Sequence, residues 1–84
     1  MNFDAFWTRI KTTVLWDHVV RAIPLSDLTV KKHLGDQVFD SRDYKILSEQ
    51  LNKIPEDIKN SEQSIRIYLS QNEVLKAVLR KTEK

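Results

Sequence analysis

The chain has no cysteine, one glycine and two prolines, and it has no long apolar run. Without cysteine, the sequence excludes disulfides, thiolate nucleophiles and cysteine-ligated zinc sites together. With so little glycine and proline, few tight turns of the kind that join strands are available, and no segment alternates strictly between apolar and polar residues. The sequence therefore argues against a β-rich fold and against a scaffold held by disulfides or zinc.

An excess of charge of one sign is also missing. The 14 Lys and Arg residues and the 12 Asp and Glu residues are interleaved and give a net charge of +2, so there is no basic block of the kind that dominates non-specific nucleic-acid binding. The longest uninterrupted apolar stretches have three residues, as at positions 14–16, and are too short to span a membrane. Asp4 stands where a secretory signal carries basic residues. We therefore expect an intracellular, cytoplasmic protein without a membrane partner.

The residues that are present predict helices. Of the 84 residues, 40% are hydrophobic and 31% are charged, which suits one globular domain, residues 1–84, with a single modest core. Apolar residues recur at helical spacing, and these stripes predict helices at roughly 3–22, 27–34, 41–52, 55–69 and 71–81, with the first and fourth each open to division into two. The expected fold class is all-α, a compact bundle of five or six short helices, in which residues 82–84 fray.

Three helix starts share one signature, a polar capping residue with an apolar pair that can staple the first turn. These are Ser26 with Leu25 and Val30, Asp40 with Phe39 and Tyr44, and Ser70 with Leu69 and Val74. An acid three residues after the cap, Asp43 or Glu73, strengthens the second and third starts.

Weaker signals mark the other boundaries. Pro55, followed by two acids, predicts a further helix start, and Asn60 with Gln63 predicts that this helix continues or restarts. Gly35 follows Leu34 at a position where a helix end favours positive φ. Thr12 and Thr13 fall where the N-terminal apolar stripe changes phase, which predicts a bend or break in the first helix.

The apolar stripes also predict a core. Trp7 and Trp16 are expected to be half-buried, each with a partner for its indole N–H. The residues expected in the core are Phe6, Ile10, Val14, Val19, Ile23, Leu28, Leu34, Tyr44, Leu47, Leu51, Ile58, Ile65, Leu69, Val74, Leu75, Val78 and Leu79.

The groups that catalysis requires are few. His18 and His33 are the only histidines, and neither stands at a spacing typical of a metal site. The acids Asp36, Asp40 and Asp43 lack the ladder of a calcium loop, and neither a Gly-rich phosphate loop nor a nucleophile elbow occurs. We therefore expect a protein that is not an enzyme and that uses no metal, cofactor or small-molecule substrate.

One segment carries the pattern Ser-x-x-Thr-Val-Lys-x-His-Leu, formed by Ser26, Thr29, Val30, Lys31, His33 and Leu34. With the residues that precede it from Asp17, this segment resembles the helix-turn-helix unit of LuxR-type regulators. The resemblance implies that Lys31, Lys32 and His33 reach phosphates and base edges of DNA, and that Arg21 contributes from the preceding helix.

Two residues depart from that family pattern. The turn position where such units favour glycine holds Pro24, whose φ of about −65° is incompatible with positive φ. The middle of the first helix, where a small residue is expected, holds Val20, which would keep the two helices apart. Binding of DNA is therefore the second interpretation of this segment.

A longer stretch, IPLSDLTVKKHLGDQVFDSRDYKIL, supports another comparison. Its Gln37-Val38-Phe39 and Asp43-Tyr44 stand about where death-fold domains of the caspase-recruitment type end one short helix and cap the next. The stretch is similar to the second-to-third helix region of those domains. The similarity implies six helices and a non-enzymatic adaptor that works through contacts between helix faces.

These observations lead to two functional hypotheses. The first is a non-enzymatic regulatory binding module, an adaptor or inhibitor that presents one helix face to a protein partner. The alternative is a small transcriptional regulator that binds DNA through residues 17–34. The candidate binding residues are Arg21, Lys31, Lys32 and His33, with Trp7 and Trp16 as anchors for a partner if they are exposed. The stripe of Phe3, Phe6, Trp7 and Ile10 is expected to be core, although it could also enter a partner's groove or lie on a membrane.

Overall fold

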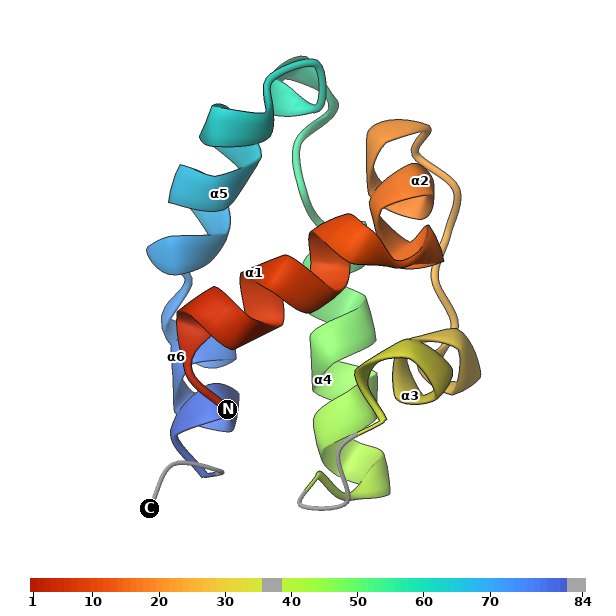
Figure 1. Cartoon of the computed structure of the whole chain (residues 1–84), viewed down its shortest axis with the longest axis vertical. Helices are drawn as coiled ribbons and strands as arrows, with labels where there is room; N and C mark the ends of the chain where they lie inside the picture. The colour runs from red at the N-terminus through yellow and green to blue at the C-terminus, as the bar shows by residue number, and fades with distance from the viewer. Residues whose placement is uncertain (36–38, 82–84) are drawn as a thin grey trace.

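The computed structural model describes residues 1–35 and 39–81, and within these ranges it contains helices and no strands. The predicted all-α class is confirmed (Figure 1). Residues 82–84, expected to fray, and Asp36, Gln37 and Val38 lie outside the described residues. The elements are α1 (Phe3–Thr12), α2 (Val14–Val20), α3 (Asp27–Leu34), α4 (Ser41–Asn52), the short 3₁₀ helix η1 (Glu56–Ile58), α5 (Glu62–Ser70) and α6 (Glu73–Arg80).

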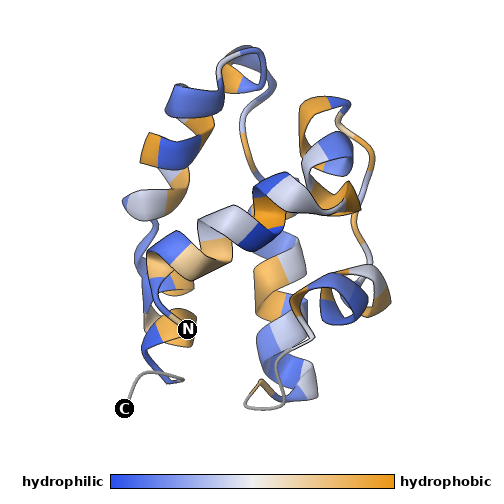
Figure 2. Ribbon diagram, in the orientation of Figure 1, coloured by the Kyte–Doolittle hydropathy of each residue, from blue (hydrophilic) through white to orange (hydrophobic). Residues whose placement is uncertain are grey.

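Helix α4 lies between α3 and α6 (Figure 1). α3 and α6 both pack against α4, and α1 lies across it and contacts α2 and α3 (Figure 1). α5 runs from η1 towards α6, and two ion pairs tie it to α1, Lys11–Glu62 at 2.6 Å and Arg66–Asp4 at 3.2 Å. Each helix carries both hydrophilic and hydrophobic residues (Figure 2), as expected for amphipathic helices around one core. Among the described helices, none has the length and apolar content needed to cross a membrane.

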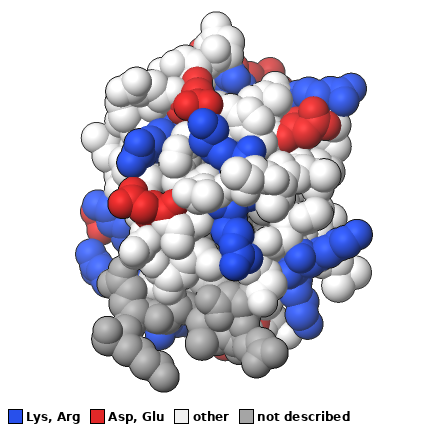
Figure 3. All heavy atoms as spheres, in the orientation of Figure 1, with Lys and Arg blue, Asp and Glu red and all other residues white. Residues whose placement is uncertain are grey.

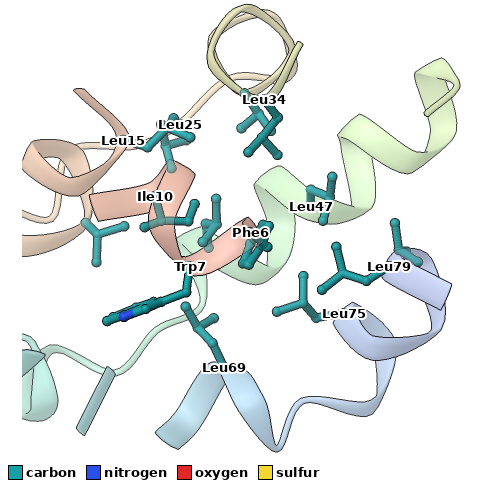
Figure 4. Packing of buried hydrophobic residues seen from close by; sticks show 14 of the residues in the cluster. Phe6, Trp7, Ile10, Leu15, Leu25, Leu34, Leu47, Leu69, Leu75 and Leu79 are labelled. Atoms are coloured by element: carbon teal, nitrogen blue, oxygen red, sulfur yellow. The ribbon is translucent and has the colours of Figure 1, made fainter. Parts of the chain in front are cut away.

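The core collects apolar residues from every α-helix. Phe6 of α1 is fully buried and lies at the centre, among side chains that include Leu47 of α4 and Leu75 of α6 (Figure 4). Burial of an aromatic side chain of this size stabilises the fold by about 2–3 kcal/mol. The buried apolar residues are Phe6, Trp7, Ile10, Leu15, Val19, Leu25, Val30, Leu34, Phe39, Tyr44, Leu47, Leu51, Ile54, Ile65, Leu69, Leu75, Val78 and Leu79.

Four residues expected in the core are exposed, namely Val14, Ile23, Leu28 and Val74, and Ile58 is half-buried. Val14, Leu28 and Val74 lie in the first turns of α2, α3 and α6, and Ile23 lies in the connection after α2. Trp7, expected to be half-buried, is buried, and five further buried residues were not among those expected in the core: Leu15, Leu25, Val30, Phe39 and Ile54.

The predicted break in the N-terminal helix is confirmed at Thr13. Its extended backbone (φ −122°, ψ 177°) separates α1 from α2, and its hydroxyl donates to the Arg9 carbonyl at 2.7 Å. The same oxygen accepts from the Leu15 N–H at 3.4 Å and so caps α2. Because the helix restarts here, Leu15 and Val19 face the core and Val14 faces solvent.

α2 ends at Val20, two residues earlier than expected. Ala22 takes the left-handed conformation (φ 55°), the N–H of Ile23 donates to the His18 carbonyl at 2.9 Å, and the N–H of Ala22 donates to the Val19 carbonyl at 3.3 Å. These bonds make up a Schellman motif with alanine where glycine is usual.

The starts of α3 and α4 are confirmed. Ser26 Oγ accepts from the Thr29 N–H at 3.2 Å. The Asp40 side chain accepts from the Asp43 N–H at 2.9 Å, and the Asp43 carboxylate accepts from the Asp40 N–H at 3.3 Å, which completes a capping box. Gly35 ends α3 with φ 52°, as predicted, and its N–H donates to the Lys31 carbonyl at 2.8 Å.

Two predicted starts are wrong by one or two residues. Ser61, and not Asn60, caps α5 through its hydroxyl, because Pro55 initiates only the single turn of η1. Asn72, and not Ser70, caps α6, with Oδ1 accepting from the Leu75 N–H at 3.0 Å. Ser70 is instead the last residue of α5.

Candidate functional site

The outward side of α3 presents an exposed leucine beside two lysines. Leu28 has 78% of its surface exposed, the largest fraction among the exposed large apolar residues. Lys31 and Lys32 follow it at three and four residues and are also exposed. Residues at these spacings are neighbours on a helix surface, so Leu28, Lys31 and Lys32 form one continuous surface, which we term the α3 face.

The sequence assigned Leu28 to the core, and the phase of α3 explains why this was wrong. Val30 and Leu34 stand four residues apart and are fully buried, so they define the inner side of the helix. Leu28 precedes Val30 by two residues, which places it about 200° around the helix axis. The positions of Leu28, Val30 and Leu34 around the helix axis, which follow from the sequence, could therefore have shown that Leu28 is exposed.

Bonds to other elements hold both ends of α3. At the N-terminal end, Asn52 Oδ1 accepts from the Leu25 N–H at 2.8 Å, and Asn52 Nδ2 donates to the Leu25 carbonyl at 2.9 Å. The Ser48 hydroxyl donates to the Asp27 carboxylate at 2.6 Å. At the C-terminal end, the Arg9 guanidinium donates to the Leu34 carbonyl at 2.8 Å. The α3 face is therefore carried by a helix fixed to both α4 and α1.

The lysines of the α3 face form no ion pair among the described residues, whose five ion pairs lie elsewhere. The nearest acid along α3, Asp27, has its carboxylate turned to Ser48. Figure 3 shows Lys and Arg side chains that stand out over α3 without an acid beside them, whereas acids and bases alternate over α1 and α5. This part of the surface has a local positive charge that the net charge of +2 does not reveal.

The other residues predicted to bind DNA do not join this face. Arg21 lies at the end of α2, is exposed, and pairs with Asp17 at 3.4 Å. His33 is half-buried, and it shares a helix side with Thr29 and not with Leu28. Of the four residues predicted to contact DNA, only Lys31 and Lys32 thus lie together on an exposed surface.

The tryptophans belong to the N-terminal part of the core. Trp7 is only 7% exposed, less than predicted, because Phe3 stacks on it with ring centroids 6.4 Å apart and Trp16 meets it edge-on at 5.7 Å. Lys11 Nζ lies 6.0 Å from the Trp7 ring centroid. Trp16 is half-buried, as predicted. Trp7 is therefore not available as an exposed anchor.

The geometry between α2 and α3 differs from a helix-turn-helix unit. Residues 21–26 separate the two helices, whereas the turn of such a unit has about three to four residues. Positive φ occurs at Ala22 and not at Pro24. Val20 is the last residue of α2 and is exposed, so it does not stand at the helix crossing that the family pattern implies.

A shallow groove of about 290 Å³ lies between the 21–26 connection and the end of α4. Ile23, Pro24 and Ile54 are among the residues that line it, together with His18 and Asn52. The Nδ1 atom of His18 is buried and has no hydrogen-bond partner among the described residues. Within the same residues, no group of three His, Cys, Asp or Glu side chains is placed to hold a metal ion.

An ion pair between the buried Asp43 and the exposed Lys81 joins α4 to the end of α6. Asp43 is 2% exposed and accepts a hydrogen bond from Lys81 Nζ at 2.8 Å. Burial on its own raises the pKa of the Asp43 carboxyl, but the hydrogen bonds from Lys81 and from the Asp40 N–H outweigh it and hold the pKa below its ordinary value. The same bond raises the pKa of Lys81. This pair links α4 to the end of α6, and neither residue belongs to the α3 face.

Comparisons of the chain with protein-family models, with curated proteins and with solved structures find no match.

Proposed function

We propose that the chain is a non-enzymatic regulatory binding module, an adaptor or inhibitor, that docks a protein partner on the α3 face. The observation that carries this proposal is Leu28, a large apolar side chain left 78% exposed on a helix that is held at both ends. Transfer of such a side chain from water into a partner's pocket contributes about 2 kcal/mol. Lys31 and Lys32, one turn along α3 from Leu28, would form part of the polar edge that usually borders the apolar centre of an interface.

Binding of DNA is the second candidate, favoured by the exposure of Lys31 and Lys32 on α3. Three features rank it lower: the long 21–26 connection, the ion pair that Arg21 forms with Asp17, and the exposed apolar side chain of Leu28 beside the two lysines. A protein that neutralises few phosphates binds DNA weakly at physiological salt.

Site-specific photocrosslinking tests the proposal. p-Benzoylphenylalanine is placed at position 28, and in a matched variant at position 67, where Ile67 of α5 is also exposed (48%). In native cells we expect discrete protein adducts from position 28 that position 67 does not give. An excess of the wild-type chain should suppress these adducts, and a Leu28→Asp chain should not.

The competitor variant is interpretable because it keeps the fold. Leu28 lies outside the core, and exposed substitutions change the free energy of unfolding by about 0.5 kcal/mol or less. The proposal is wrong if the Leu28→Asp chain competes as well as wild type, or if positions 28 and 67 give the same adducts. Adducts at position 28 that disappear on nuclease treatment, with mobility shifts of duplex DNA that Lys31→Ala/Lys32→Ala abolishes, would support DNA binding instead.

A further inference from the structure

We propose that a cleft between α1 and α5 binds a small carboxylate that is carried on an aromatic or branched apolar group. The cleft has a volume of about 270 Å³. None of its lining residues belongs to the α3 face, so this site is separate from the proposed docking surface. The residues that line it are Trp7 of α1 and Glu62, Gln63, Arg66, Ile67 and Ser70 of α5.

Two ion pairs place Trp7 between α1 and α5. Along α1, Trp7 lies three residues after Asp4 and four residues before Lys11, spacings that put the three side chains on one side of the helix. Asp4 pairs with Arg66 of α5 at 3.2 Å. Lys11 pairs with Glu62 of α5 at 2.6 Å. Trp7 therefore lies, along α1, between two contacts that join this helix to α5.

The indole N–H of Trp7 is the group that points to a ligand. Trp7 is only 7% exposed, and no described residue accepts a hydrogen bond from its Nε1 atom. Among the described residues, the buried polar atoms without a partner include His18 Nδ1 and not this nitrogen, so the N–H is open to solvent where Trp7 lines the cleft. In Figure 4 the indole extends away from Phe6. A buried tryptophan usually has a partner for this N–H, and an acceptor atom bound in the cleft would supply one.

The α5 wall of the cleft adds further donors. Arg66 holds Asp4 Oδ1 through Nη2 at 3.2 Å, and its other guanidinium N–H groups bond to no described residue. The Asp4 side chain is 81% exposed, and exposed ion pairs of this kind contribute little to stability, so a ligand carboxylate can replace Asp4 at low cost. Gln63 is exposed and its amide bonds to no other described residue. The cleft thus offers several donors to one acceptor-rich group, and a carboxylate suits the planar guanidinium.

The remaining lining residues describe the rest of the ligand. Glu62 opposes an anion only weakly, because Lys11 Nζ lies 2.6 Å from its carboxylate. The ring of Trp7 and the side chain of Ile67, which is 48% exposed, give the cleft an apolar part. Its volume equals that of about nine water molecules at ~30 Å³ each, which is less than most drug-sized pockets have. We therefore expect a ligand of about ten non-hydrogen atoms.

Titration followed by NMR tests the inference. The chain has two tryptophans, so a ¹⁵N-labelled sample gives two indole N–H signals, which a Trp16→Phe variant assigns. Phenylacetate is the probe, and phenylacetamide, which has the same ring without the charge, is its matched control. We expect phenylacetate to move the Trp7 signal saturably, with a dissociation constant on the order of 1 mM for a ligand of this size. The amide should bind at least about tenfold more weakly.

A pair of variants tests the role of Arg66. Arg66→Gln should weaken the binding of phenylacetate at least about tenfold. The matched control is Arg21→Gln, because Arg21 is also exposed and pairs with Asp17 at 3.4 Å, outside the cleft. This control and the Leu28→Asp chain should both bind like wild type, whatever the outcome of the crosslinking at the α3 face.

A peptide probe distinguishes the two sources of such a carboxylate. Acetyl-Gly-Gly-Phe carries it at the end of a chain, so tighter binding of this peptide than of phenylacetate identifies a chain terminus as the ligand, and weaker binding identifies a free acid. No saturable movement of the Trp7 signal at about 20 mM phenylacetate overturns the inference. Equal binding of phenylacetate and phenylacetamide, or of phenylacetate and inorganic phosphate, overturns it as well. So does an equal loss of binding in Arg66→Gln and Arg21→Gln, because binding would then follow the net charge of the protein.

Discussion

The left-handed conformation of Ala22 predicts that a glycine substitution stabilises this protein. Ala22 has φ 55°, a region that costs an L-residue about 1–2 kcal/mol relative to the right-handed helix. Glycine removes that cost but loses about 0.5–1 kcal/mol through the greater freedom of its unfolded chain. The balance for Ala22→Gly is a rise of about 0.5 kcal/mol in the free energy of unfolding, or roughly 2–4 °C in Tm for a domain of this size.

The matched control is Ala77→Gly. Ala77 is exposed within α6, where the backbone is right-handed and only the cost of glycine applies, so this variant should lose about 1 kcal/mol and roughly 4–8 °C. Thermal and urea unfolding followed by circular dichroism at 222 nm measures both. The reasoning is refuted if Ala22→Gly lowers Tm by as much as Ala77→Gly, because Ala22 would then not hold a left-handed cap.

Two further predictions concern bonds between elements. Asn52→Ala removes both bonds to the Leu25 backbone and should lower the free energy of unfolding by about 2 kcal/mol. The control Lys53→Ala, at an exposed neighbouring residue, should change it by less than about 0.5 kcal/mol. Equal urea midpoints for the two variants would contradict this prediction. The pKa of Asp43 is lower in the folded state than its ordinary value of 3.8. The ionised carboxylate therefore adds fully to the free energy of unfolding above pH 3.8, and this contribution is lost as the pH falls through the pKa of the folded state. The wild type should therefore exceed Asp43→Asn in stability at pH 7, and the difference should shrink below pH 3.8; a difference that stays constant down to pH 2 would remove the pairing with Lys81 as its cause.

Local patterns predicted the parts of the fold that depend on local chemistry. Ser26 and Asp40 cap their helices because each cap needs only residues within one turn, and the Phe39–Tyr44 staple is present with ring centroids 5.6 Å apart. The break at Thr13 follows from a phase change that is visible along the stripe.

Local sequence rules did not decide between two neighbouring residues that could each cap a helix. Ser70 and Asn72 are both competent caps, and the sequence favours Ser70 because Glu73 completes a capping box. In the structure, Asn72 also donates to Gln50 Oε1 of α4 at 2.9 Å, a contact that local rules do not describe. Leu28 shows the same limit for the site, because an apolar residue in a short helix was assigned to the core before the phase set by Val30 was applied.

The attachment of α3 at both ends has a consequence for the docking that we propose. Arg9 secures the last carbonyl of the helix, and Ser48 and Asn52 secure its first turn and the residue before the cap. A helix held in this way would lose little backbone entropy on docking a partner, so more of the contact energy of Leu28 would remain as affinity. We therefore expect the amide hydrogens at the centre of α3 to exchange with solvent as slowly as those at the centre of the longer α4.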